Sequence, residues 1–353
     1  MLKAYKYRIY PNKEQKIQIA KTFGCCRFVY NQILAYHKDA YENEKKSVSK
    51  TDCNNYCNRE LKKEYEWLKD VDKFALTNAI YNMDAAYRKF FKEHAGYPKF
   101  KSKRDNHKSY TTNYTNENIV VDFEKGRVKL PKLKMVKAKQ PRKFEGQIKS
   151  ATITQMPSGK YFVSILVEEE QVELPKVEKS VGIDLGIKDL VITSDGEKID
   201  NLKLIKKYEN KLVRQQRKLA HKQKGSKNRE KQRIKVAKIY EKIANTRNDY
   251  LHKISHKLIN ENQVIVSEDL SVSNMVKNSN LAKPISDCGW SEWTRQLQYK
   301  ADWYGRTYIK IGRFVPSSQI CHVCGYKNEE TKDLSVRKWT CPQCRTEHDR
   351  DIN

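Results

Sequence analysis

The sequence predicts an α+β protein of several domains, built from antiparallel strands, a helical segment and a separate mixed α/β region. Three changes of pattern predict this class. Residues 2–10 alternate apolar and polar side chains as a strand does, residues 13–103 follow a helical period, and residues 109–172 return to a period of two. The length of 353 residues allows two or three domains at about 100–200 residues each.

The first strand and the later strands are expected to form one small antiparallel β-barrel into which the helical segment is inserted. Pro11-Asn12 ends the first strand and starts a helix. Residues 151–156 and 161–167 flank the turn Pro157-Ser158-Gly159, which predicts a β-hairpin. The helical segment stops at Gly96-Tyr97-Pro98, and its clearest apolar stripe has strides of four and three: Leu76, Ile80, Met83, Tyr87 and Phe90.

A second region begins after Pro175-Lys176, which we expect to be a linker. Residues 180–186 predict a strand that ends near Asp184, and residues 188–193 predict the next strand. Residues 263–266 predict another buried strand, followed closely by Glu268. An aromatic-rich helix is expected over residues 290–305, and a further strand over residues 308–311.

The charge of the chain points to a polyanionic partner. Lys and Arg number 71 against 43 Asp and Glu, a net charge of +28, which favours nucleic acid. Residues 203–257 alone hold 19 Lys and Arg against four acidic residues. This stretch predicts a helical hairpin; a merely solvated hairpin would mix its signs, so we expect phosphate contacts. The candidates are at its turn: Lys222, Lys224, Lys227 and Arg229.

The sequence also excludes two classes of protein. No run of about 18 apolar residues predicts a membrane span. The first residues lack the apolar core of a secretion signal. We therefore expect a cytoplasmic protein with no membrane partner.

Four of the nine cysteines predict a zinc site. Cys321-x2-Cys324 and Cys341-x2-Cys344 have the spacing of a zinc ribbon, in which four thiolates hold a structural Zn²⁺. Gly325 permits the tight turn of the first knuckle. His322 and His348 lie nearby, but four thiolates already complete the ion's coordination. We expect the other cysteines, including Cys53-x3-Cys57, to be small buried hydrophobes.

Acidic residues far apart in the sequence form a second candidate site. Asp184 and Glu268 each follow a buried strand, and Asp349 and Asp351 lie close to the end of the sequence. An acidic residue after a strand is most often a turn or cap residue. Carboxylates at the ends of neighbouring strands can instead share two Mg²⁺ ions for phosphodiester hydrolysis.

Several motifs in order along the chain match those of one known family. Ile183-Asp184-Leu185-Gly186 with Ser194-Asp195-Gly196 is similar to the first motif of RuvC nucleases of the RNase H fold. Val266-Ser267-Glu268-Asp269-Leu270 resembles the second. Two further stretches are Ser317 through Asn353 and Tyr7-Arg8-Ile9-Tyr10-Pro11-Asn12. They resemble the zinc ribbon with the third motif, and the N-terminus, of the TnpB (OrfB) family encoded by insertion sequences, which is similar to compact type V CRISPR effectors.

The resemblance implies an RNA-guided DNA endonuclease of a prokaryotic transposable element, associated with the nucleoid. Such a protein binds a guide RNA from the transposon end, as a monomer with one RNA, and cuts matched double-stranded DNA beside a short motif. Carried over by motif, Asp184, Glu268 and Asp351 would be the catalytic Mg²⁺ ligands. Asp351 is preferred to Asp349 because the family's catalytic Asp precedes one residue and then Asn, as in Asp351-Ile352-Asn353.

The resemblance also implies a division of the chain into domains. Residues 1–10 and 105–176 would form the wedge barrel, and residues 11–104 the helical recognition lobe. Residues 177–317 would form the RuvC-like nuclease domain, including the basic hairpin at 203–260. Residues 318–348 would form the zinc ribbon and residues 349–353 the last RuvC motif.

The recognition lobe and the wedge would read the target-adjacent motif. Amides of Asn78 and Asn82, on the polar face of a helix, are suited to adenine edges, and Tyr110 is a further candidate for DNA contact. The alternative is a solvated helix face.

The family's third motif usually continues into Ala-Ala and a helix, whereas this sequence stops at Asn353. We expect a truncated last motif with fraying next to Asp351. This leaves an alternative function, an RNA-guided DNA-binding protein that acts like a repressor with little or no cleavage.

Overall fold

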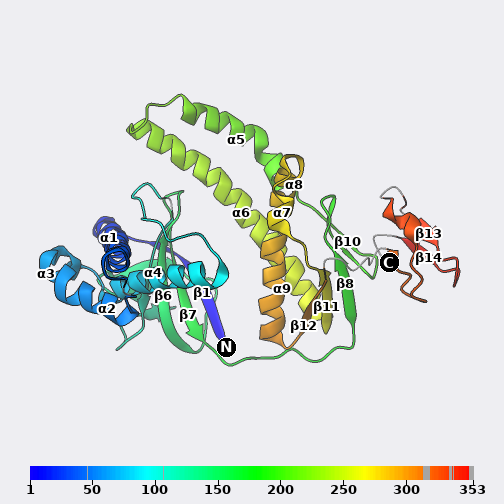
Figure 1. The fold of residues 1–353 in the computed structure, drawn as a ribbon, viewed down its shortest axis with the longest axis horizontal. Coiled ribbons are helices and arrows are strands. Elements are labelled where there is room, and N and C mark those ends of the chain that lie inside the picture. Colours follow the sequence, from blue (N-terminus) through cyan, green and yellow to red (C-terminus); the bar gives the residue numbers. More distant parts are fainter. Residues whose placement is uncertain (46, 106, 313–318, 334–335, 337, 350–353) are drawn as a thin grey trace. The chain divides into compact units, whose positions relative to one another are not determined.

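The computed structural model describes residues 1–45, 47–105, 107–312, 319–333, 336 and 338–349. The chain divides into two compact units after Glu170 (Figure 1). In the described ranges, no helix has the length and apolar character needed to cross a bilayer.

The first unit holds the helical segment expected from the sequence. α1 begins with a capping box, because the Asn12 side chain accepts from the Gln15 amide and the Gln15 side chain accepts from the Asn12 amide. The first three residues of the predicted stripe on α4 are buried. A π-helical turn and a 3-10 turn separate the helices, whose bounds are α1 (Lys13–Glu44), α2 (Lys50–Tyr56), η1 (Cys57–Leu61), α3 (Lys62–Glu64), η2 (Glu66–Asp70) and α4 (Lys73–Glu93).

The strands of the first unit pair in one antiparallel sheet of order β2-β6-β7-β1-β5-β4-β3. The N-terminal strand lies inside this sheet between two strands that follow the helices in sequence, as predicted. The predicted hairpin at Pro157-Ser158-Gly159 is confirmed as β6 and β7. The bounds are β1 (Leu2–Tyr10), β2 (Lys108–Asn113), β3 (Val120–Asp122), β4 (Arg127–Leu130), β5 (Lys134–Lys139), β6 (Gln147–Gln155) and β7 (Tyr161–Glu168).

The predicted closure of these strands into a barrel is wrong for the described residues. β2 and β3 are the two edges and do not pair with each other, so the sheet is open. A period-two pattern fixes which face each side chain takes, but it is the same in an open sheet and in a barrel. Closure depends on pairing between distant edges, and β3 has only three residues to offer.

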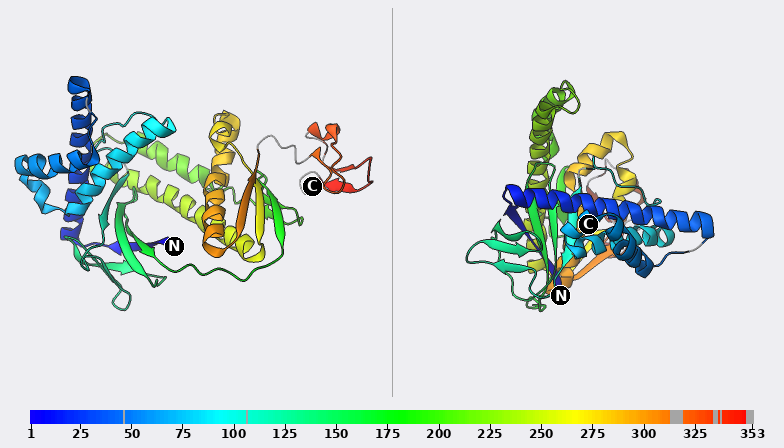
Figure 2. Two further views of the ribbon diagram at one scale, coloured as in Figure 1. Left: turned by 60° about the horizontal axis from the view of Figure 1, so that its bottom comes forward. Right: turned by 90° about the vertical axis from the view of Figure 1, so that its left-hand side faces the viewer.

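The second unit is built on a mixed sheet of order β10-β9-β8-β11-β12. β10, β9 and β8 are antiparallel, whereas β8, β11 and β12 are parallel. Apolar side chains of β8 and β11 share one core with α6 and α9, which lie on one side of the strands (Figure 1; Figure 2). The bounds are β8 (Ser180–Asp184), β9 (Asp189–Thr193), β10 (Lys198–Asp200), β11 (Val264–Glu268) and β12 (Thr307–Ile311).

A long helical hairpin separates β10 from β11 in sequence, as predicted. Ser226 caps its second helix by accepting from the Arg229 amide. The first helix has no side-chain cap of its own, and Asp287 supplies one by accepting from the Ile205 amide. The helices of the unit are α5 (Leu204–Ala220), α6 (Lys227–Glu261), α7 (Val272–Met275), α8 (Ser279–Cys288) and α9 (Trp290–Tyr304).

The two cysteine pairs lie in a small separate substructure toward the end of the chain. It contains the short helix η4 (Glu329–Lys332) and an antiparallel pair of strands, β13 (Lys338–Thr340) and β14 (Glu347–Asp349). Its buried hydrophobic residues, Cys321, Trp339 and Cys341, form their own small cluster.

Arg306 joins three segments of the second unit. Its Nε donates to the Ile259 carbonyl at the end of α6, and its Nη1 donates to the Gln263 side chain before β11. Its Nη2 donates to the Pro175 carbonyl in the segment that leads into β8. The side chain is buried, and its planar guanidinium satisfies all three acceptors at once.

Arg306→Lys is expected to lower the free energy of unfolding of the second unit by about 1.5–3 kcal/mol, because an ammonium cannot reach all three acceptors. Urea unfolding followed by tryptophan fluorescence measures this, since Trp290 and Trp293 are buried in this unit. The control is Arg295→Lys, because Arg295 is exposed and pairs with Glu292. Equal urea midpoints for the two variants would contradict the conclusion that Arg306 stabilises the second unit by joining three segments.

Candidate functional site

Parallel pairing brings Asp184 and Glu268 to neighbouring strand ends. Ser180 lies opposite Val264, and the register continues to Ile183 opposite Ser267. The next position on each strand is the predicted carboxylate, which is also the last residue of the strand. Neighbouring strands lie about 4.8 Å apart, so the two acidic side chains project from adjacent backbones.

Both carboxylates lie on the face of the sheet opposite the helices. Along β8 and β11 the buried positions are Val181, Ile183, Ile265 and Ser267, and the acidic residues fall at the alternate positions. Val181, Ile183 and Ile265 belong to the core shared with α6 and α9. Side chains alternate between faces, so Asp184 and Glu268 point away from that core and are half-buried.

The turn after Asp184 explains the glycine in its motif. A Cβ on Gly186 would lie 2.5 Å from the Asp189 carbonyl oxygen, so a larger residue would displace the start of β9. The Leu185 amide donates to Asp184 Oδ1 at 2.9 Å. The turn therefore holds the carboxylate at the strand end.

The third acidic position is only partly described. Asp351 lies outside the described residues, and Asp349 is the last residue of β14. Among the described residues, one group of three or more possible metal ligands lies close enough together to share an ion, and it consists of four cysteines rather than of acidic residues. The structure thus brings together two of the three predicted catalytic residues.

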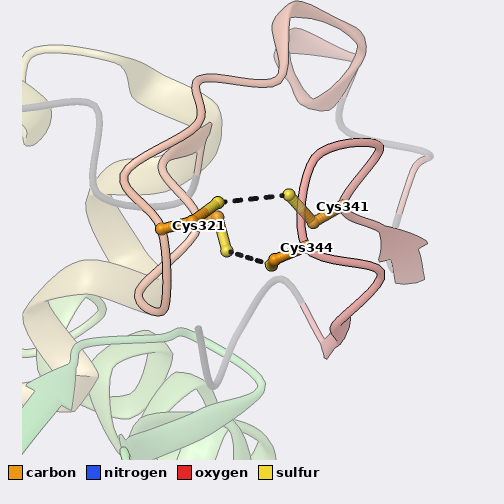
Figure 3. A group of neighbouring side chains, drawn as sticks. Cys321, Cys341 and Cys344 are labelled. Carbon is orange, nitrogen blue, oxygen red and sulfur yellow. Dashed lines mark hydrogen bonds between the residues drawn. The ribbon is translucent and has the colours of Figure 1, made fainter.

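The four predicted zinc ligands converge, as expected. Cys321 Sγ lies 3.5 Å from Cys344 Sγ, and Cys324 Sγ lies 3.5 Å from Cys341 Sγ (Figure 3). All four sulfur atoms lie within 4.8 Å of one another. Tetrahedral Zn–S bonds of about 2.3 Å need sulfur separations of about 3.8 Å, so the set fits zinc and leaves no open position.

Two matching turns present the thiols. The Gly325 amide donates to the Cys321 carbonyl, and the Arg345 amide donates to the Cys341 carbonyl, both at 2.8 Å. Gly325 and Arg345 occupy the same place in their turns, and each has a positive φ. Glycine adopts a positive φ without strain, which agrees with the prediction that Gly325 permits the first turn. The Thr346 hydroxyl lies 3.1 Å from Cys344 Sγ, and this hydrogen bond lowers the pKa of Cys344 toward the thiolate that zinc requires.

The remaining cysteines are buried free thiols, as predicted: Cys25, Cys26, Cys53, Cys57 and Cys288. Burial raises the pKa of Cys53 to about 12 and of Cys288 to about 11. They behave as small hydrophobes rather than as nucleophiles.

The four predicted phosphate-binding residues lie around the turn of the α5–α6 hairpin, but their surroundings differ. Lys224 and Lys227 are exposed, and Lys222 is half-buried. Arg229 donates from Nη1 to the Leu219 and Lys222 carbonyls, which closes the end of α5. Its guanidinium therefore has a structural task in the turn.

Sequence reasoning missed a basic groove along the shaft of the hairpin. Its volume is about 530 Å³, and Tyr208 and Ile239 help to line it. Its six cations come from matching positions of the two helices, with strides of three and four: Lys211, Arg214 and Lys218 of α5 and Lys235, Lys238 and Lys242 of α6. That repeated spacing was the signal in the sequence. All six side chains are exposed, so the groove presents a strongly cationic surface.

The predicted contacts in the first unit line an open groove of about 870 Å³ between α1, α4 and β2. Asn82 is exposed there. Asn78 is committed elsewhere, because its amide donates to the Phe74 and Thr111 carbonyls and to the Asn113 side chain. Tyr110 is buried and packs edge-on against Phe23, so its ring supports the groove floor. Of the three candidates, Asn82 has its amide on the surface.

Comparisons with known proteins agree with this architecture. The OrfB_IS605 family model, described as a probable transposase, matches residues 164–279. A helix-turn-helix domain model matches residues 1–46, and a Cas12f1-like TNB domain model matches residues 290–353. A structure titled as a Cas12f1–sgRNA–target DNA complex shares the fold, with a TM-score of 0.62 over 100% of this chain and 97% of that chain at 12% identity.

Curated relatives match along the whole chain. A Streptomyces pristinaespiralis protein named "Putative RNA-guided DNA endonuclease" is 37% identical, over 99% of this chain and 87% of its own length. The Escherichia coli K12 protein of the same name, InsQ, is 32% identical over 100% of this chain and 90% of its own length. The class is therefore that of transposon-associated proteins, with a fold shared with the Cas12f1 complex. Within it, the chain belongs to the TnpB (OrfB) family, as the sequence motifs indicated.

Purified protein is expected to contain one zinc ion per chain, and Cys341→Ser is expected to lose it because three thiolates bind zinc far more weakly. Elemental analysis after dialysis against a mild chelator measures this. Cys57→Ser is the control, since Cys57 lies in the core of the first unit. Zinc retained by Cys341→Ser, or lost equally by both variants, would refute the four-thiolate site.

Replacing Lys218, Lys235 and Lys238 by Gln is expected to weaken binding to a short single-stranded RNA and to reduce its salt dependence. Three lost phosphate contacts reduce the slope of log K against log salt concentration by about 2. Fluorescence anisotropy at several salt concentrations measures the slope. The control replaces three lysines that already pair with acidic residues, Lys253, Lys257 and Lys283. Equal slopes in the two triple variants would show that the groove does not bind phosphate.

Proposed function

We propose that this protein is an RNA-guided DNA endonuclease with a RuvC-type site. The observation that carries the proposal is the placement of Asp184 and Glu268 at adjacent ends of parallel strands, on the face away from the helical core. Two carboxylates in that arrangement are the oxygen ligands that Mg²⁺ prefers. The names of the relatives support the same activity.

Each acidic residue has a definite task in this proposal. Asp184, fixed by the turn at Gly186, and Glu268, fixed by pairing on both sides of β11, hold their carboxylates in place before substrate arrives. Asp351 is the proposed third ligand. Magnesium bound there would activate a water molecule and stabilise the departing 3′ oxygen. The chain itself supplies rigid positioning.

The rest of the molecule would hold the nucleic acids. A net charge of +28 suits a complex with a guide RNA and a DNA target, and the α5–α6 groove offers six exposed cations to a phosphate backbone. Base pairing between guide and target would carry the sequence specificity. Asn82, exposed in the groove of the first unit, is the residue we propose for reading the target-adjacent motif.

The experiment that tests the proposal uses the ribonucleoprotein. The protein is co-expressed with RNA from its flanking locus, purified, and incubated with Mg²⁺ and a plasmid that carries a guide-matched target beside a randomised motif. We expect cutting that requires both the RNA and the matched target. The motifs found beside the cut sites then identify the target-adjacent sequence. Matched binding without cutting would instead support the RNA-guided binding protein, and cutting without RNA would contradict guidance.

Asp184→Asn and Glu268→Gln are each expected to reduce cleavage at least about a hundredfold, because a neutral amide cannot hold the catalytic cation. Guided binding of the target should persist in both. Asp195→Asn is the matched control, since Asp195 lies in the next turn of the same sheet and pairs with Lys179 at the surface. Unchanged cleavage in either site variant, with zinc intact, would remove these strand ends from the active site.

A further inference from the structure

His348 is a buried polar side chain with no assigned role. It is 3% exposed, and its Nε2 lies 3.1 Å from Cys321 Sγ. We propose that His348 is a positioning residue, which donates a hydrogen bond to the Cys321 thiolate and thereby ties β14, the strand that precedes Asp351 in the sequence, to the zinc cluster. The part of this inference that concerns cleavage rests on the proposed function, whereas the part that concerns zinc does not.

The chemistry of the contact fixes which atom donates. A thiolate that binds zinc has no proton, so the proton of this hydrogen bond belongs to His348 Nε2. Four thiolates around one Zn²⁺ leave a net charge of −2 in a buried cluster, and hydrogen-bond donors offset that charge. Among the described residues, His348 Nδ1 is buried and has no hydrogen-bond partner, so Nε2 is the ring nitrogen that makes a polar contact.

The ring is held in this orientation by its neighbours. His348 lies opposite Trp339 in the β13–β14 pair, and the two ring centroids are 4.4 Å apart with 33° between their planes. The exposed His322 ring also contacts His348, with 4.9 Å between ring centroids and nearly perpendicular planes. The contact with Trp339, which is itself buried, holds the ring in this rotamer, so the donor is aimed before metal binds.

The hydrogen bond from His348 to Cys321 matters because His348 lies in β14, shortly before the proposed ligand Asp351 in the sequence. β14 runs from Glu347 to Asp349, and Asp349 lies opposite Lys338. Alternation along the strand turns His348 toward the cluster and its two neighbours away from it. Asp351 follows three residues after His348 in the sequence. Anchoring His348 to Cys321 therefore fixes where the last acidic motif begins.

Two substitutions separate the hydrogen bond from the packing. His348→Gln keeps an N–H donor near the position of Nε2 but loses the ring, whereas His348→Phe keeps the ring stacked on Trp339 but loses the donor. His322→Gln is the control for a neighbouring imidazole, because His322 is exposed and follows the same knuckle cysteine.

The first measurement is zinc transfer from the full-length protein to a chromogenic chelator, together with the thiolate-to-cobalt absorption bands of the Co²⁺-substituted protein. His348→Phe is expected to release zinc at least about tenfold faster and to shift the cobalt bands, since loss of an outer hydrogen bond costs about 10–100-fold in metal affinity. His348→Gln and His322→Gln should stay within about threefold of the parent. Parent-like release by His348→Phe, or equal loss in His348→Gln, would overturn the hydrogen-bond role.

The second measurement is guided cleavage by the same proteins under zinc-saturating conditions. His348→Phe is expected to cut more slowly while it binds guide RNA and target normally, and His348→Gln is expected to restore the rate. Full cleavage by His348→Phe, with its zinc defect confirmed, would overturn the coupling to the last motif. If the parent protein does not cut at all, the proposed function fails while zinc release still decides the role of His348.

Discussion

The parallel pairing of β8 with β11 is the constraint on which the candidate site depends. It places two carboxylates at one edge although a hairpin of more than 50 residues separates their strands in the sequence. The same register buries Val181, Ile183 and Ile265 against α6 and α9, so hydrophobic burial on one face holds the acidic pair on the other. A slip of one residue would exchange these faces and expose the apolar side chains, so the hydrophobic core fixes the register that places the two carboxylates.

The surrounding contacts keep that sheet and its long insertion in one unit. Asp287 caps α5 and Arg247 donates to the Ser286 carbonyl, so both helices of the basic hairpin are joined to the segment before α9. Burial raises the pKa of Asp287, while amides of α5 stabilise its charged form. Arg306 joins α6 to the segment that leads into β8, because it donates to the Ile259 and Pro175 carbonyls. The hairpin that carries much of the positive charge is thus built onto the layer that supports the carboxylates.

Local patterns predicted the strands, the helices, the hairpin turn and the cysteine knuckles, because each depends on neighbouring residues or on a fixed spacing. Barrel closure was wrong because it depends on edges far apart in sequence. The tasks of Asn78, Tyr110 and Arg229 were hidden for the same reason, since their partners or packing come from other elements. The catalytic roles of Asp184 and Glu268 remain proposals, and the third predicted ligand, Asp351, lies outside the described residues.

The most direct test of the central claim locates the bound cation itself. Fe²⁺ substituted for Mg²⁺ in the ribonucleoprotein, with ascorbate and peroxide, produces hydroxyl radicals that cut the polypeptide near the ion, and mass spectrometry maps the cuts. The account predicts cuts next to Asp184 and next to Glu268 in the same sample, both suppressed by excess Mg²⁺. Cuts at one of these strand ends without the other, or at neither, would contradict a cation shared between β8 and β11.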